Sequence, residues 1–329
     1  MVNLSMTHNM YSGIQPKTYI RLPSHSSLAR PKKLTRAVLA SVLAPAYWLL
    51  SHRYEVPGLG LRADCAIFGL RLLPSIWRNK LYSEVYRLLF WPMDSIRYFE
   101  FDFAWNALRN FPIALYLDVS SPRLFPILLA LKNSELSAEF LNPDAGDLSS
   151  TEDLVEGFGV RSRCKFHNCL ISELSVAPNS FDAITSISVL EHIPEDTNAV
   201  QRMWDLLKPN GKLLVTVSCA AKTSDQYVDR NEYGLLSPDE KGYYFFQRLY
   251  DQQSLEKRVF AVTGLPRRQV VYGEKLPGTL RRNLDRKMSD PWYPHWREPY
   301  MMGQDFCYFR DLAELPGEGV VGLEFEKGD

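Results

Sequence analysis

Two apolar runs of strand length flank an amphipathic helix in the middle of the chain, and this pattern restricts the fold more than any other. Residues 180–190 (SFDAITSISVL) and 212–218 (KLLVTVS) are largely apolar, and residues 197–208 (TNAVQRMWDLLK) lie between them. A strand that is apolar on both sides is buried on both sides, as in parallel sheets whose strands are joined by helices. The segment therefore predicts a strand–helix–strand unit with parallel strands.

The same alternation continues on both sides of this unit. Further strand-like runs lie at residues 113–119, 137–144, 164–170, 267–274 and 320–327, and helical patterns lie at residues 125–132, 150–159 and 251–264. The segment 275–310 is aromatic and loop-like in pattern. This order predicts an α/β fold built on a doubly wound, Rossmann-like and mostly parallel sheet of seven strands.

The chain divides into three parts by composition. Residues 1–33 are rich in Ser, Pro and Asn and are expected to form a poorly ordered leader. Residues 34–105 form a helical, basic extension, and the first 100 residues carry 13 Lys and Arg against 5 Asp and Glu. Residues 106–329 form the main domain, with a polar insertion at about residues 220–250. The charge asymmetry predicts either different surroundings for the two ends or charge pairing between them.

Composition excludes several classes of protein. With 46% hydrophobic and 23% charged residues the chain is globular, and a net charge of zero with both signs mixed among the aromatic segments does not favour nucleic-acid binding. The five cysteines have no metal-like spacing, so no metal site is expected. We interpret them as reduced and mostly buried, which predicts a cytoplasmic protein.

Residues 37–50 (AVLASVLAPAYWLL) form the most apolar run and follow several Lys and Arg residues. Fourteen residues are fewer than the ~20 that a spanning helix needs. Two interpretations stay open: a helix that lies on a membrane surface, and a helix that packs on the main domain. The first would give peripheral membrane contact through residues 34–100 and a membrane-associated location.

The block 180–196 (SFDAITSISVLEHIPED) followed by 206–217 (LLKPNGKLLVTV) resembles the second half of class I S-adenosylmethionine-dependent methyltransferases, of the methyltransferase type 11-like group. That family has a strand opened by Phe-Asp, a Leu-x-His-Ile turn, a helix, a Leu-Lys-Pro-Gly-Gly turn and a fifth strand. Here Asn210 replaces one glycine of that turn, and Asn tolerates the left-handed backbone conformation. The resemblance implies S-adenosylmethionine as cofactor.

The resemblance also assigns the loop after the first strand of the domain, LDVSSPRL, to cofactor binding. Asp118 falls on the family's acidic position, and Ser120 and Ser121 offer hydroxyl and backbone N–H groups. Ser120, Pro122 and Leu124 stand where glycines are expected, so the glycine loop is degenerate.

Three more strand ends are expected to border the cofactor. Asn142 stands where the second strand usually ends in an acid for the ribose hydroxyls, and Asp144 follows two residues later. Cys169 and Leu170 stand at the adenine position, with Asn168 as the nearest polar side chain. The segment from Ser188 to His192 would border the methyl group.

Glu191 and His192 are the candidate catalytic residues. His192 has an imidazole whose ordinary pKa suits proton transfer near neutral pH. The alternative is a packing histidine that bonds to the backbone. Methyl transfer is an in-line displacement to which positioning alone contributes much, so a catalytic base is not obligatory.

We therefore predict an enzyme that moves a methyl group from S-adenosylmethionine to O or N of a small or lipid-linked acceptor. The alternative is a non-catalytic, methyltransferase-like binding or scaffold protein that has lost the glycine loop. The aromatic residues of the insertion and of residues 292–296 either form a lid over the acceptor or cover the sheet edge. The sequence leaves the acceptor and the oligomeric state open.

Overall fold

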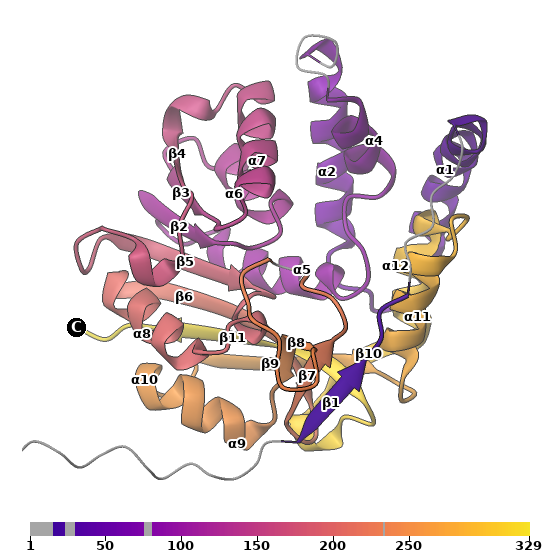
Figure 1. Ribbon diagram of the computed structural model, residues 1–329. Helices are drawn as coiled ribbons and strands as arrows, with labels where there is room; N and C mark the ends of the chain where they lie inside the picture. Colours follow the sequence, from indigo (N-terminus) through magenta and orange to yellow (C-terminus); the bar gives the residue numbers. More distant parts are fainter. Residues whose placement is uncertain (1–15, 24–29, 76–80, 233) are drawn as a thin grey trace, which may run out of the picture.

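The computed structural model describes residues 16–23, 30–75, 81–232 and 234–329 and centres on an eight-stranded sheet (Figure 1). The strand order is β10-β9-β11-β6-β5-β2-β3-β4. Strands β4, β3, β2, β5 and β6 are parallel neighbours, whereas β11, β9 and β10 each pair antiparallel. The bounds are β2 (Leu115–Val119), β3 (Ser137–Leu141), β4 (Cys164–His167), β5 (Phe181–Ile187), β6 (Leu207–Ala220), β9 (Arg268–Glu274), β10 (Phe306–Phe309) and β11 (Glu318–Glu326).

The mostly parallel α/β fold is confirmed, but the sheet has eight strands and not seven. The additional strand is β10, which pairs with β9 at the sheet edge. It lies in the segment 275–310, which was wrongly expected to be loop-like. That segment also forms α11 (Thr279–Ser289), the short turn η6 (His295–Arg297) and α12 (Glu298–Asp305). Each element there is short, and Gly and Pro between the elements hide their periodicity.

Helices cover both faces of the sheet, and the side chains of its strands alternate between two cores. Tyr116 and Phe140 face the first core, together with α6 (Leu124–Lys132) and α7 (Ala145–Gly157). Leu117 and Leu141 face the second core, together with α8 (Asp196–Leu206) and the helical segment α9 (Gln252–Leu255), η5 (Glu256–Phe260) and α10 (Ala261–Thr263). This alternation makes the sheet the middle layer of three.

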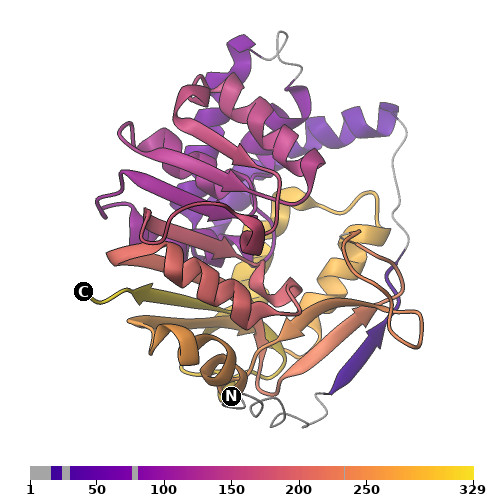
Figure 2. The ribbon, with the colours of Figure 1, turned by 60° about the vertical axis from the view of Figure 1, so that its left-hand side comes forward.

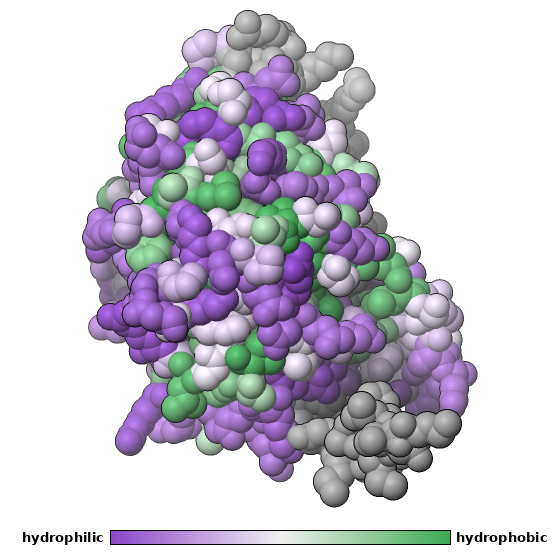
Figure 3. All heavy atoms as spheres, turned by 90° about the vertical axis from the view of Figure 1, so that its left-hand side faces the viewer, coloured by the Kyte–Doolittle hydropathy of each residue, from purple (hydrophilic) through white to green (hydrophobic). Residues whose placement is uncertain are grey.

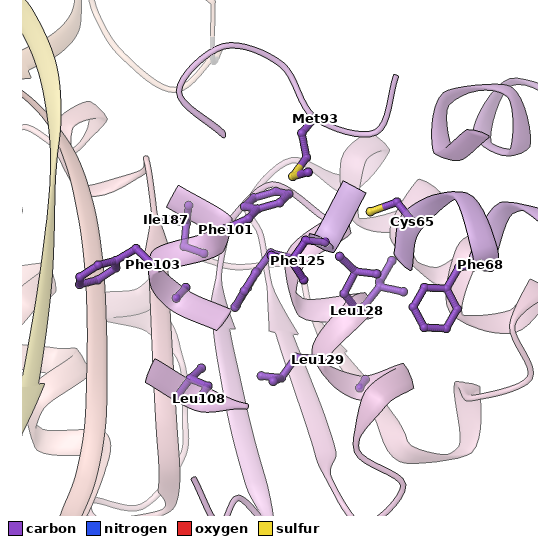
Figure 4. Packing of buried hydrophobic residues seen from close by; sticks show 14 of the residues in the cluster. Cys65, Phe68, Met93, Phe101, Phe103, Leu108, Phe125, Leu128, Leu129 and Ile187 are labelled. Atoms are coloured by element: carbon purple, nitrogen blue, oxygen red, sulfur yellow. The ribbon is translucent and has the colours of Figure 1, made fainter. Parts of the chain in front are cut away.

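The N-terminal extension is helical and shares the first core. It forms α1 (Arg30–Ser51), α2 (Leu59–Leu72), η1 (Leu73–Ser75), α4 (Tyr82–Phe90) and α5 (Arg97–Leu108). On α5, Phe101 contacts Phe125 of α6 with ring centroids 5.6 Å apart, and Cys65 and Phe68 of α2 lie beside the same core (Figure 4). The extension therefore folds onto the main domain over buried apolar surface.

The polar insertion forms a second sheet with a piece of the leader. Strands β7 (Ser224–Val228) and β8 (Tyr244–Leu249) pair antiparallel, and β1 (Lys17–Ile20) adds parallel to β7. The expectation of a poorly ordered leader does not hold for residues 17–20, while residues 1–15 and 24–29 lie outside the described residues. Buried Arg248 of β8 pairs with Asp196 at the start of α8 and with Asp225, which ties the second sheet to the main domain.

The carboxyl ends of the parallel strands lie toward the helical extension, as Figures 1 and 2 show. The opposite end, where the parallel strands begin, is mostly hydrophilic with separate small apolar groups (Figure 3). Across the described ranges, no helix combines the length and apolar character needed to span a bilayer.

Helix α5 lies close to the sheet because Gly322 of β11 leaves room for the ring of Phe103. A Cβ atom at this glycine would lie 2.8 Å from atoms of the ring. We expect Gly322→Ala to lower the free energy of unfolding by about 1–3 kcal/mol through overpacking. The measurement is urea unfolding followed by circular dichroism.

Gly328→Ala is the matched control, because no atom lies within 4 Å of a Cβ built there. Adding Phe103→Leu to Gly322→Ala should recover part of the lost stability, since it removes ring atoms from the crowded site. If Gly322→Ala and Gly328→Ala have the same stability, this account of how α5 packs is wrong.

Candidate functional site

The strand order reverses between β2 and β5, and this point positions the candidate site. From β2 the chain moves outward to β3 and β4, and from β5 it moves the other way to β6. In open α/β sheets a crevice forms outside the carboxyl ends of the strands at such a switch point. The residues expected to bind cofactor follow the carboxyl ends of β2, β3, β4 and β5.

Asp118 near the end of β2 is buried among hydroxyl groups. Its carboxylate accepts hydrogen bonds from Thr185 Oγ1 at 3.0 Å, from Tyr116 Oη at 3.3 Å and from the backbone N–H of Ser121 at 3.2 Å. Burial raises the pKa of Asp118 to about 7, although these hydrogen bonds oppose the shift. The carboxyl group therefore holds the loop after β2 in place through its bond to the N–H of Ser121.

The loop after β2 keeps a glycine-like backbone without glycine. Ser120 has φ +53°, and both its N–H and its hydroxyl donate to the carbonyl of Leu141 at the end of β3. The Ser121 hydroxyl accepts the N–H of Ile187 at 3.0 Å and is buried. The two serines thus tie β2 to its neighbours on both sides, so the turn keeps its shape although Pro122 and Leu124 replace glycines.

The end of β3 presents one amide and two carboxylates. Asn142 donates from Nδ2 to Asp147 at 3.0 Å and accepts the N–H of Asp144 on Oδ1 at 2.9 Å. Asp144 caps α7 by accepting two backbone N–H groups, and Asp147 also pairs with Arg123 at 2.8 Å. The ion pair therefore links the loop after β2 to the first turn of α7.

The end of β4 contributes less polar surface. The Asn168 amide donates to the carbonyls of Asn142 and Pro143, which joins the ends of β3 and β4. Cys169 is half-buried and burial raises the pKa of its thiol, while the Leu170 side chain is 43% exposed. Asn168 is therefore the residue that contacts the end of β3, and the assignment of Cys169 and Leu170 to the adenine position stays a prediction.

The end of β5 carries a second buried carboxyl group. Ser188 has φ +53° and donates from its hydroxyl to Glu191 Oε1 at 2.9 Å. Glu191 is fully buried, and its Oε2 has no hydrogen-bond partner among the described residues. Burial, followed by the nearby carboxylate of Glu100, raises the pKa of Glu191 to about 7.

Glu100 of α5 is a site residue that the sequence analysis missed. It is fully buried, pairs with Arg97 and accepts the hydroxyl of Thr216 at 2.8 Å. Thr216 Oγ1 also accepts the N–H of Ser188, so this network joins α5, β6 and the end of β5. One signal in the sequence was available, because Glu100 lies within the aromatic run YFEFDF. An acid in such a run is expected to be buried, and a buried carboxyl group needs a hydrogen-bond or charge partner.

His192 points toward the second sheet. Its Nδ1 lies 2.6 Å from the carbonyl oxygen of Phe246 on β8, and burial lowers the pKa of the imidazole to about 4. A neutral ring that donates from Nδ1 satisfies this contact. The geometry agrees with the packing alternative, because His192 connects the turn after β5 to the insertion.

The described residues gather no three His, Cys, Asp or Glu side chains that could hold a metal ion. The site instead combines two positive-φ serines, amides at the ends of β3 and β4, and one carboxylate oxygen that has no partner among the described residues. Such a set fits a ligand with hydroxyl groups and a positive charge.

The central part of the chain is similar to known proteins. Residues 134–215 match the family model described as a methyltransferase domain. Ubiquinone biosynthesis O-methyltransferases from Xanthomonas euvesicatoria pv. vesicatoria (strain 85-10) and Xanthomonas axonopodis pv. citri (strain 306) are each 31% identical over 88 residues, 27% of this chain. The match spans only 36% of the length of these relatives.

Solved structures with a similar course of the chain include the [4+2]-cyclase SpnF, with a TM-score of 0.44 and 16% identity over 69% of this chain and 79% of that one. A putative sarcosine dimethylglycine methyltransferase from Galdieria sulphuraria has a TM-score of 0.42 and 15% identity over 66% and 79% of the two chains. Residues 134–215 of the chain therefore resemble a methyltransferase domain.

Proposed function

We propose that this chain is an S-adenosylmethionine-dependent methyltransferase that acts on O or N of a small or lipid-linked acceptor. The observation that carries the proposal is the switch point, where positive-φ Ser120 and Ser188 lie at the ends of β2 and β5 and Ser188 bonds to the buried Glu191 carboxyl group. The matched region 134–215 supports it, since it runs from β3 through most of β6.

The residues present fit the cofactor in charge and in polarity. Asn142 with Asp147 would accept the ribose hydroxyls, whereas the N–H groups of Ser120 and Ser121 already donate to Leu141 and Asp118. Asn168, Cys169 and Leu170 would border the adenine ring. When bound, S-adenosylmethionine supplies an electrophilic methyl group on a positively charged sulfur.

Glu191 is better suited than His192 to take a proton from the acceptor. A pKa of about 7 leaves part of the Glu191 carboxyl groups ionised at neutral pH, and a base is most useful when its pKa lies near the working pH. The imidazole of His192, with a pKa of about 4, is a weak base and holds Phe246 of the insertion. We assign His192 to positioning of the second sheet.

The acceptor is proposed from the surroundings of the site and from the relatives. The second sheet places Phe246 beside the turn that carries Glu191, so the insertion can cover the acceptor. The names of the Xanthomonas relatives, O-methyltransferases of ubiquinone biosynthesis, favour an acceptor that is methylated on oxygen. We further propose a cytoplasmic location with peripheral membrane contact through residues 34–100. Both would suit an acceptor that is linked to a lipid.

A non-catalytic binding protein is the second candidate. The observations that favour it are Pro122 and Leu124 in the loop after β2 and the ion pair between Arg123 and Asp147, which joins two cofactor loops. The side chains of Ser120 and Asn142 are also occupied by protein hydrogen bonds. A cofactor could bind these two side chains only by displacing their present hydrogen-bond partners.

Calorimetric titration with S-adenosylhomocysteine separates the two candidates. We expect micromolar binding by the full chain, weakened at least tenfold by Asp118→Ala, because loss of the carboxylate frees the N–H of Ser121 and the hydroxyl of Thr185. Asp153→Ala, at an exposed position of α7, should bind as the wild type does. No heat change at millimolar ligand would show that the enzyme proposal is wrong.

Glu191→Gln should lower the rate of methyl transfer about 10²-fold or more, since an amide cannot accept the proton. Transfer of a labelled methyl group to a panel of phenols and amines is the assay. The wild-type rate should rise with pH through about 7 as the Glu191 carboxyl group ionises. Exposed Glu195→Gln is the control and should keep both rate and pH profile. If Glu191→Gln keeps the wild-type pH profile, Glu191 is not the group that accepts the proton.

The same carboxyl group predicts a pH dependence of stability that needs no acceptor. A pKa raised from 4.5 to about 7 means that the folded chain disfavours the ionised form. The penalty is absent below about pH 4.5 and complete above about pH 7, so wild-type stability should fall between them by about 1–3 kcal/mol relative to Glu191→Gln. Urea unfolding at pH 5 and pH 8 tests this. If the free energy of unfolding changes by the same amount between the two pH values in both proteins, the prediction is wrong.

A further inference from the structure

Helix α1 carries an exposed apolar stripe along its outer face. Val38, Val42 and Leu49 have exposed fractions of 57%, 68% and 63%, and Leu39 beside them is 41% exposed. At 100° per residue the first three fall within a narrow arc of the helix surface, with Ala46 on the same side. The stripe is about 16 Å long at a rise of 1.5 Å per residue.

The opposite face of α1 is packed against the protein. Ala40 and Ala44 are buried in a small core with Trp296 of η6, and Tyr47 contacts Tyr300 of α12 with ring centroids 5.7 Å apart. Arg36 donates to the carbonyl of Pro291 at 3.1 Å. The helix is thus held at the edge of the molecule (Figures 1 and 2). The exposed fractions of its apolar stripe show that the stripe faces outward.

The charges of α1 are all positive. Its sequence from Arg30 to Ser51 has four Lys or Arg residues and no Asp or Glu, and no charged residue interrupts the run from Ala37 to Ser51. Apolar side chains on one face with cations at the end of the helix favour an interface between hydrocarbon and anionic head groups. A symmetric contact with a second copy would bring like charges together.

We propose that the outer face of α1 docks the protein on an anionic lipid bilayer, with Val38, Val42 and Leu49 entering the acyl boundary. This deepens the peripheral contact contained in the proposed function, but it does not depend on methyl transfer. The helix would lie in the plane of the surface, because its apolar stripe is about half the ~30 Å thickness of the hydrocarbon core. A lipid-linked acceptor would then be presented at the same surface.

Co-sedimentation with vesicles tests the proposal on the full chain without cofactor. We expect binding to vesicles of phosphatidylcholine with 30% phosphatidylglycerol, much weaker binding to phosphatidylcholine alone, and loss of binding as salt screens the cations. Val42→Glu should weaken binding to the anionic vesicles about tenfold, because it places a negative charge in the apolar stripe.

Leu265→Glu is the matched control, since Leu265 is 83% exposed in the turn between α10 and β9 and should leave binding unchanged. Thermal melts should be alike for the three proteins, as both substituted side chains face solvent. Sedimentation of Val42→Glu at the wild-type level, or no sedimentation of the wild type, overturns the proposal. A wild-type dimer by light scattering that Val42→Glu converts to monomer would assign the face to a second copy instead.

Discussion

The candidate site depends on the burial of two carboxyl groups, Asp118 and Glu191, at the ends of adjacent parallel strands. Each lies where water is excluded, and each has a pKa raised to about 7 because ionisation without full solvation is costly. Hydroxyl groups satisfy them in part: that of Thr185 on β5 for Asp118, and those of Ser188 after β5 and Ser218 on β6 for Glu191. The same bonds position the loops after β2 and β5.

The two carboxyl groups differ in what remains unsatisfied. Asp118 has three donors and serves the fold, because it holds the N–H of Ser121 and two hydroxyl groups. Among the described residues Glu191 has donors on one oxygen only, and its other, buried oxygen has no partner. This asymmetry is why we place structural support at the end of β2 and proton transfer at the end of β5.

The sequence predicts the parallel centre of the fold well, because strand and helix periods alternate without interruption from β2 to β6. The segment Pro209–Gly211 is an instance: Asn210 was expected to tolerate a left-handed backbone and has φ +60°, although the segment is an irregularity within β6 and not a turn before it. Elements whose stability comes from distant partners were not predicted. β1 exists only by pairing with β7, more than 200 residues away, and β10 only by pairing with β9. Glu100 was missed for the same reason, since Thr216, its partner, lies on β6.

The helical extension links the candidate site to the outer face of α1. Helix α5 brings Glu100 to the end of β5, and the residues just before α5 bond to α12, where Glu298 accepts the N–H of Ser95 at 3.1 Å. Helix α12 in turn packs against α1 through Tyr300. A surface held by α1 and a carboxyl group held by α5 are therefore parts of one packed body. If α1 lies on a bilayer, the carboxyl ends of β5 and β6 have a constant position relative to that bilayer, which is what an acceptor anchored in lipid would require.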